Sequence, residues 1–255
     1  MGQERWVPFR RLGRVSSGKD DRLSALSWML RGLLGVGGAV LAVVSWPVAK
    51  AAWQAQKAST VVFELRTGKP SNFADIQAGI EAFDLAVAAD PVAGRRLARS
   101  ELLAGAALTQ NLPVSAEQRE VWLKRALADL DFGLGNAPAR GVAWSRLASV
   151  RQALEGTSAR VVAALMMSLD TAPVMSSLWP SRLRLFLDNW QYLTPKERDR
   201  VAANVEMSWR VSADRRWFAE AIRSPIDELF VRYFIRDVPD AQDQLTRMLA
   251  ALQRK

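Results

Sequence analysis

The chain has 255 residues, of which 49% are apolar and 24% are charged, which excludes a largely unfolded chain and one that crosses a membrane many times. It contains no cysteine and no histidine, which excludes disulfides and thiolate chemistry and removes the commonest general base and metal ligand. The net charge is +9, and residues 1–50 hold eight Lys/Arg against three Asp/Glu, over half of the excess. We therefore expect no catalytic residues, no cofactor or metal and no nucleic-acid partner, and we read the charge as a membrane topology signal.

An uncharged apolar segment covers residues 32–49. As an α-helix rising about 1.5 Å per residue, it spans about 27 Å, close to the hydrocarbon thickness of a bilayer. Tryptophans, which favour membrane interfaces, stand near its two ends: Trp28, Trp46 and Trp53. We interpret 32–49 as a single transmembrane helix. Two alternatives stay open, a buried helix of a soluble domain and a signal peptide cleaved near Ala49-Lys50-Ala51.

Basic residues are unevenly placed around this segment: seven Lys/Arg precede it and four follow within about 20 residues. Cytoplasmic flanks carry the positive excess, so residues 1–31 are expected to be a basic cytoplasmic segment. The chain beyond about residue 54 is then expected on the other side of the membrane.

Small residues follow one another at intervals of four on this helix. Gly35 precedes Ala39, and Gly38 precedes Ala42, by the spacing that lets transmembrane helices approach closely. This spacing predicts packing against another membrane helix and leaves the oligomeric state open.

Residues 50–72 are interpreted as a linker or juxtamembrane helix, and 73–255 as one helical domain beyond the membrane. A helix is expected from Phe73 to Pro91. Its face carries the small, aromatic and small residues typical of the second helix of a tetratricopeptide unit: Gly79, Phe83 and Ala86.

Two markers recur after 35 residues, close to the 34-residue tetratricopeptide period. Pro138 is followed by Pro173, and Trp144 by Trp179. This interval predicts a tetratricopeptide-like α-hairpin repeat domain. A helical domain without true repeats stays open, because Pro91 and Pro138 are 47 residues apart.

One hairpin of this domain is expected around Gly156. Trp144 and Leu147 occupy packing positions of its first helix, Gly156 forms the turn, and Ser158 caps a second helix over 159–169.

Later helices carry their own start signals. Thr194 and Glu197 flank Pro195 as a capping box with proline at the first helical position. Asp214, Ser224 and Asp240 are expected to open further short helices. No stretch alternates with period two, so we predict an all-α fold.

Candidate chemistry is sparse. Asp188, Glu197 and Asp199 are close in sequence, but a capping role for Glu197 and surface roles for the two aspartates explain them better than acid–base catalysis. Asp237, Asp240 and Asp243 lack the glycine and final glutamate of a calcium loop.

Tryptophans and arginines supply the candidates for partner binding or repeat packing. Tryptophans more often anchor a core than bind a sugar ring, and arginines more often lie on a solvated face than on an anionic glycan or acidic partner. The candidates are Trp144, Leu147, Trp179, Arg182, Arg184, Trp190 and Trp209.

Short apolar sequence motifs in the C-terminal half resemble those of a known family. They are Ser181-Arg182-Leu183-Arg184-Leu185, Trp190, Leu193-Thr194-Pro195 and Val205-Glu206-Met207-Ser208-Trp209. The pattern resembles the VpsP-like group of single-pass helical-repeat proteins of bacterial exopolysaccharide and O-antigen assembly systems, over about residues 120–225. The resemblance implies a non-catalytic accessory or scaffold subunit in the inner membrane, with a periplasmic domain and no catalytic residues to transfer.

Three functions follow as hypotheses. The first is a membrane-anchored scaffold whose concave repeat face binds a protein of a polysaccharide polymerase or export complex. The second is direct binding of a glycan, which an exposed row of tryptophans would support. The third is a single-pass subunit of an unrelated inner-membrane complex.

Overall fold

A computed structural model describes residues 20–254 except 68, 70, 71 and 111. The described chain is helical throughout, without a strand. The α-helices are α1 (Asp20–Arg66), α2 (Phe73–Ala89), α3 (Ala93–Leu108), α4 (Ala116–Asn136), α5 (Gly141–Glu155), α6 (Ala159–Thr171), α7 (Trp179–Asp188), α8 (Pro195–Val211), α9 (Arg216–Ala221), α10 (Pro225–Phe234) and α11 (Ala241–Leu252). Two 3₁₀ turns, η1 (Ser176–Leu178) and η2 (Trp190–Tyr192), flank α7. The predicted all-α class is confirmed.

Two compact units divide the chain, residues 1–49 and 50–255. Within the described residues of the first unit, α1 is long and apolar enough to cross a membrane. Its large apolar side chains from Trp28 to Val48 are exposed. Most of the basic segment predicted over 1–31 lies outside the described residues.

Helix α1 does not end with the apolar segment. The sequence separates a span over 32–49 from a linker or juxtamembrane helix over 50–72, whereas one helix runs through Pro47 to Arg66. Residues 50–66 carry no glycine or proline to break it. Ala51, Ala58 and Val61 are buried in the second unit. This unit therefore begins at residue 50, before the predicted boundary at residue 73.

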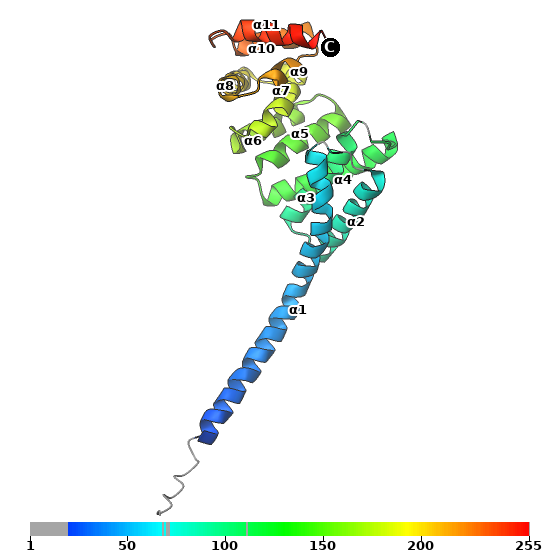
Figure 1. The fold of residues 1–255 in the computed structure, drawn as a ribbon, viewed down its shortest axis with the longest axis vertical. Helices are drawn as coiled ribbons and strands as arrows, with labels where there is room; N and C mark the ends of the chain where they lie inside the picture. The colour runs from blue at the N-terminus through cyan, green and yellow to red at the C-terminus, as the bar shows by residue number, and fades with distance from the viewer. Residues whose placement is uncertain (1–19, 68, 70–71, 111, 255) are drawn as a thin grey trace, which may run out of the picture. The chain divides into compact units, whose positions relative to one another are not determined.

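The second unit is a succession of contacting helical pairs (Figure 1). Helix α3 packs on α4 and α5 on α6, and short loops make the paired helices antiparallel. Contacts also join α2 to α3 and α4 to α5. In addition, α5 contacts both α3 and α7. One apolar core continues from Ala58 to Leu245, with α8–α11 completing its C-terminal part.

Local sequence signals account for most helix ends. Asn72, Ser158, Thr194 and Ser224 each accept a hydrogen bond from a backbone N–H in the first turn of the helix that follows. The predicted capping box of Thr194 and Glu197 is present. The predicted helix starts at Ser158, Thr194 and Ser224 are confirmed, whereas the cap at Asn72 was not predicted. Arg215 and not Asp214 is the N-cap residue of α9, and Asp240 precedes α11 without a side-chain cap hydrogen bond.

Glycine is required at two close positions around the α5–α6 hairpin. Gly156 ends α5 with φ +77°, a left-handed conformation that side chains rarely adopt. A Cβ on Gly141 would lie 2.4 Å from the Cβ of Ala172, so α5 can start directly against the end of α6.

Two tryptophans 35 residues apart make the same contact. The indole N–H of Trp144 donates to the carbonyl of Pro138 at 2.7 Å, and that of Trp179 donates to the carbonyl of Pro173 at 3.5 Å. Each bond ties the first turns of α5 or α7 to the loop before it. The 35-residue interval in the sequence therefore has a structural equivalent.

Candidate functional site

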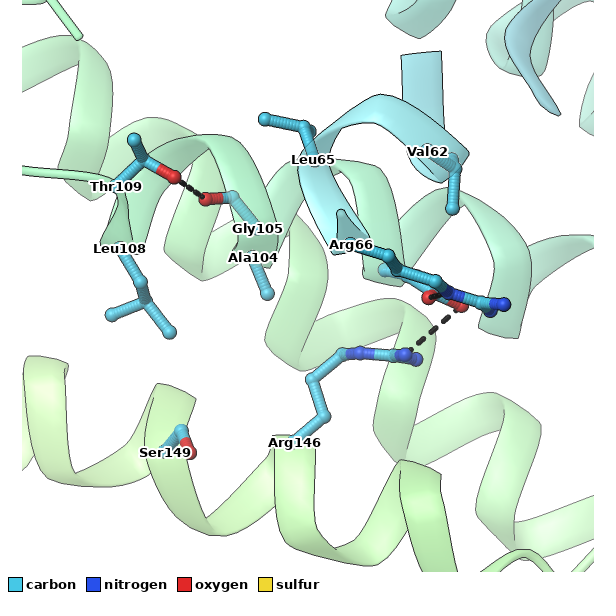
Figure 2. Close-up of a pocket in the computed structure, with 10 residues that line it drawn as sticks. Val62, Leu65, Arg66, Ala104, Gly105, Leu108, Thr109, Arg146 and Ser149 are labelled. Carbon is cyan, nitrogen blue, oxygen red and sulfur yellow. Dashed lines mark hydrogen bonds and ion pairs between the residues drawn. The ribbon is translucent and has the colours of Figure 1, made fainter. Parts of the chain in front are cut away.

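The helices α1, α3 and α5 line a groove made of two adjoining hollows of about 240 and 440 Å³. Both hollows share Arg66, Glu101 and Arg146, which we call the groove triad. The smaller hollow adds Val62, Leu65, Ala104, Gly105, Leu108, Thr109 and Ser149 (Figure 2). The larger adds Gly94, Leu97, Ala98, Arg140, Gly141, Val142, Ala143, Thr171, Ala172 and Met175.

Three helices bring the triad together. Arg66 is in the last turn of α1, Glu101 lies midway along α3, and Arg146 is in the second turn of α5. Nη2 of Arg146 lies 3.0 Å from Oε2 of Glu101, and Nε of Arg66 donates to Oε1 of the same carboxylate. In Figure 2 the side chains of Arg66 and Arg146 point toward one another from α1 and α5. Glu101 therefore bridges two arginines from different helices.

The triad lies at different depths. The side chain of Arg66 is 63% exposed, whereas those of Glu101 and Arg146 are 18% and 14% exposed. Arg146 also donates through Nη1 to the carbonyl of Leu97 at 3.3 Å. Arg146 is thus held at the floor of the groove, while Arg66 stands at its edge.

Charge and burial shift the pKa values in the triad. Burial would raise the pKa of Glu101, but the hydrogen bond from Arg66 and the charge of Arg146 outweigh it and lower the pKa. Burial lowers the pKa of Arg146, and Glu101 offsets this only in part. The hydrogen bond to Glu101 raises the pKa of Arg66. At neutral pH the triad holds two positive charges and one negative charge.

The predicted candidate residues lie outside this groove. Leu147, Trp179 and Trp209 are buried, and Trp144 and Trp190 are half-buried. Of the tryptophans described in the second unit, Trp53 alone is exposed, so no exposed tryptophan row is present there. Most of these side chains pack in the core.

The two candidate arginines have partners inside the domain. Arg182 is 1% exposed and donates to the hydroxyl and carbonyl oxygens of Ser168 and to the carbonyl of Ala172. Burial lowers its pKa to about 10. Arg184 pairs with Asp188 and, at 2.9 Å, with Asp227. Both arginines join helices.

The candidate residues for helix packing lie on the exposed part of α1. Gly35, Gly38, Ala39 and Ala42 are exposed, and a Cβ on either glycine would meet nothing within 4 Å.

An aromatic cleft of about 470 Å³ lies between α8 and α10. The ring of Trp190 is 4.5 Å from that of Phe230, and the guanidinium carbon of Arg198 is 5.3 Å from the Trp190 ring centroid. Leu229 and Tyr233 complete the cleft with Pro195 and Asp199. Nε of Arg198 is buried and has no hydrogen-bond partner in the described part of the chain.

Two of the three carboxylates considered for catalysis are engaged in other ways, and the third, Asp199, is exposed. Asp188 accepts from Arg184 and Gln152, and Glu197 completes the capping box of α8. Among the described residues, no three His, Cys, Asp or Glu side chains are grouped to hold a metal ion.

Sequence reasoning missed the groove triad and Arg140. Arg66, Glu101 and Arg146 are ordinary polar residues of helices whose mutual packing the sequence does not reveal. No local pattern distinguishes them from the other arginines and glutamates of the chain. Only the packing of α1, α3 and α5 brings them together.

Comparisons of the chain with protein-family models, with curated proteins and with solved structures found no match.

Proposed function

We propose that this protein is a non-catalytic scaffold, anchored in a membrane by α1, whose helical-repeat domain holds a protein partner in the groove. The observation that carries the proposal is the groove itself, an apolar groove with a charged centre lined by α1, α3 and α5. Helical-repeat proteins use such extended surfaces for binding.

The repeat character of the domain is part of the proposal. The stacked antiparallel pairs α3–α4 and α5–α6 support it, as do the equivalent bonds of Trp144 and Trp179. In this arrangement α1, α3 and α5 are the first helices of successive units. Their shared face is the one that lines the groove.

The apolar segment of α1 supports the anchor. With residues 1–31 in the cytoplasm, the second unit lies in the periplasm of a bacterial inner membrane. The small residues at Gly35, Gly38, Ala39 and Ala42 suit packing against a membrane helix of the partner. An anchor raises the local concentration of the domain beside a membrane-bound partner.

The resemblance to the VpsP-like group supports a setting, an exopolysaccharide or O-antigen polymerase or export complex. The scaffold role does not depend on it. A subunit of an unrelated inner-membrane complex would use the same anchor and groove.

The test is purification of the full chain in mild detergent and identification of the proteins that accompany it. We expect a membrane protein to co-purify, and replacement of residues 32–49 by an unrelated apolar helix to reduce its recovery. Alanine at the exposed Asp199 should leave recovery and cellular output unchanged. A folded, partner-binding D199A variant without polymer output would contradict the scaffold function and point to an enzyme or to glycan binding in the aromatic cleft.

A second candidate function is glycan binding in the aromatic cleft between α8 and α10. Its support is the grouping of Trp190, Phe230 and Tyr233 with Arg198 and Asp199, which together offer rings for sugar faces and polar groups for hydroxyls. Under this function, Tyr233→Ala should weaken oligosaccharide binding measured by calorimetry. Tyr192→Ala, an exposed tyrosine outside the cleft, should not.

A further inference from the structure

Positive charge exceeds negative charge along the groove. Arg66 and Arg146 share the single carboxylate of Glu101. Arg140, at the N-terminal end of α5, lines the larger hollow and is exposed. Within the described part of the chain, the side chain of Arg140 makes no ion pair or hydrogen bond. The groove therefore presents three guanidinium groups against one carboxylate.

The floor of this groove is shielded from water. Arg146 is mostly buried, and both burial and the nearby positive charge of Arg66 lower its pKa. A further carboxylate placed here would gain charge-assisted hydrogen bonds with guanidinium groups that Glu101 alone does not saturate.

The walls around the charged centre are aliphatic. Leu65 and Leu108 line the smaller hollow, and Leu97, Val142 and Met175 line the larger. Of the described residues that line either hollow, none is aromatic, so the groove offers no ring on which a sugar could stack. Aliphatic walls on both sides of a cationic centre suit a peptide better than a glycan.

We infer that the groove binds an extended peptide segment of the partner that carries an aspartate or glutamate between aliphatic residues. The acidic side chain meets the groove triad and Arg140, and the aliphatic neighbours enter the two hollows. This inference rests on the proposed function and adds the chemistry of the ligand.

The experiment uses the full chain in detergent and a phage-displayed library of random peptides. Enriched peptides are synthesised with a fluorescent label, and their affinities are measured by anisotropy. We expect an acidic residue flanked by aliphatic ones in the enriched sequences. Replacing the acidic residue by its amide should weaken binding about tenfold, the loss of one charge-assisted interaction.

Arg140→Gln is the decisive variant, because this exposed side chain has no partner inside the described protein and its loss spares the fold. This variant should bind the acidic peptide about tenfold more weakly than wild type does, and higher salt should weaken the binding of the peptide to wild type. The matched control is Arg160→Gln on α6, whose side chain is 76% exposed and lies outside the groove. It should leave the affinity within about twofold.

Three outcomes would overturn the inference. Groove-binding peptides without acidic residues, blocked by Val142→Trp, would leave the proposed function standing and refute the charge argument. Equal affinities for wild type and R140Q would place the peptide elsewhere. Arg140-dependent binding of polygalacturonate, with no peptide enriched, would refute both the peptide ligand and the protein-scaffold function.

Discussion

At the residue scale, arginines serve as caps for helix C-termini. The last carbonyl groups of a helix lack intrahelical donors and carry partial negative charge. Arg182 donates to the carbonyl of Ala172, the residue after α6, and to that of Ser168 in its last turn, which also accepts from the N–H of Ala172. Arg119 donates to the carbonyls of Ala107 and Thr109 at the end of α3. Arg215 does the same for Trp209 in α8. Part of the positive charge of the sequence is thus structural.

Arg182 tests this role. Arg182→Met keeps most of the side-chain volume but removes the side-chain donor to the carbonyl of Ala172 and the second donor to that of Ser168, which keeps the N–H of Ala172. We expect a loss of about 1–3 kcal/mol in unfolding free energy. Arg182→Ala should cost more, because it adds a cavity. Urea denaturation of the full chain in detergent measures both. A methionine variant as stable as wild type would mean that the burial cost of the charge cancels its hydrogen bonds.

Glu101 gives the groove a defined pH dependence. Its pKa is lowered in the folded state, so its ion pairs stabilise the fold above the unfolded value of about 4.3 and are lost as pH falls through the folded value. Wild type should therefore exceed Glu101→Gln in unfolding free energy by the largest amount at pH 7, and this difference should shrink below about pH 4.3. Denaturation midpoints of both proteins from pH 7 to pH 3 measure it. A difference independent of pH would contradict the ionised bridge.

At the element scale, the α5–α6 hairpin is the best-defined unit of the domain. Leu147 and Leu165 are 2% and 0% exposed and belong to one core, while Trp144 packs at its edge. Gly156 and Ser158 form the turn between the helices. The hairpin combines short-range signals with buried apolar residues at helical spacing.

Leu165→Ala should lower the free energy of unfolding by about 2–5 kcal/mol, because the side chain is fully buried and its removal leaves a cavity between the surrounding helices. The matched control is Met167→Ala on the same helix, at 36% exposure, with an expected cost below about 1 kcal/mol. Chemical denaturation compares the two. Equal costs would show that α6 packs in another register.

Short-range features were predictable and long-range ones were not. The caps at Ser158 and Thr194 and the turn at Gly156 follow from side chains within three residues of the helix end, so sequence sufficed for them. For residues 50–72 the sequence left a linker and a juxtamembrane helix open, and it did not predict that α1 continues unbroken to Arg66, because the end of the apolar segment does not by itself end a helix. The groove triad was missed because it depends on the packing of three helices.

At the scale of the whole molecule, the proposed topology puts the second unit across the membrane from residues 1–31. A reporter fused after Lys255 that is active only outside the cytoplasm should therefore be active, and one active only in the cytoplasm should be silent. Both fusions are compared in the same cells. The reverse pattern would contradict the positive-inside assignment, and a mature chain starting near Ala52 would replace the anchor by a signal peptide.

The central claim, that the groove holds a protein partner at the membrane, is tested most directly by photocrosslinking in living cells. A photoreactive amino acid replaces Val142, which lines the larger hollow, and in a control chain replaces Val211, which is 66% exposed at the end of α8. The account predicts a crosslink from position 142 to a discrete protein in the membrane fraction, weakened by Arg140→Gln and absent from position 211. No crosslink from position 142, or one of equal strength from both positions, would contradict it.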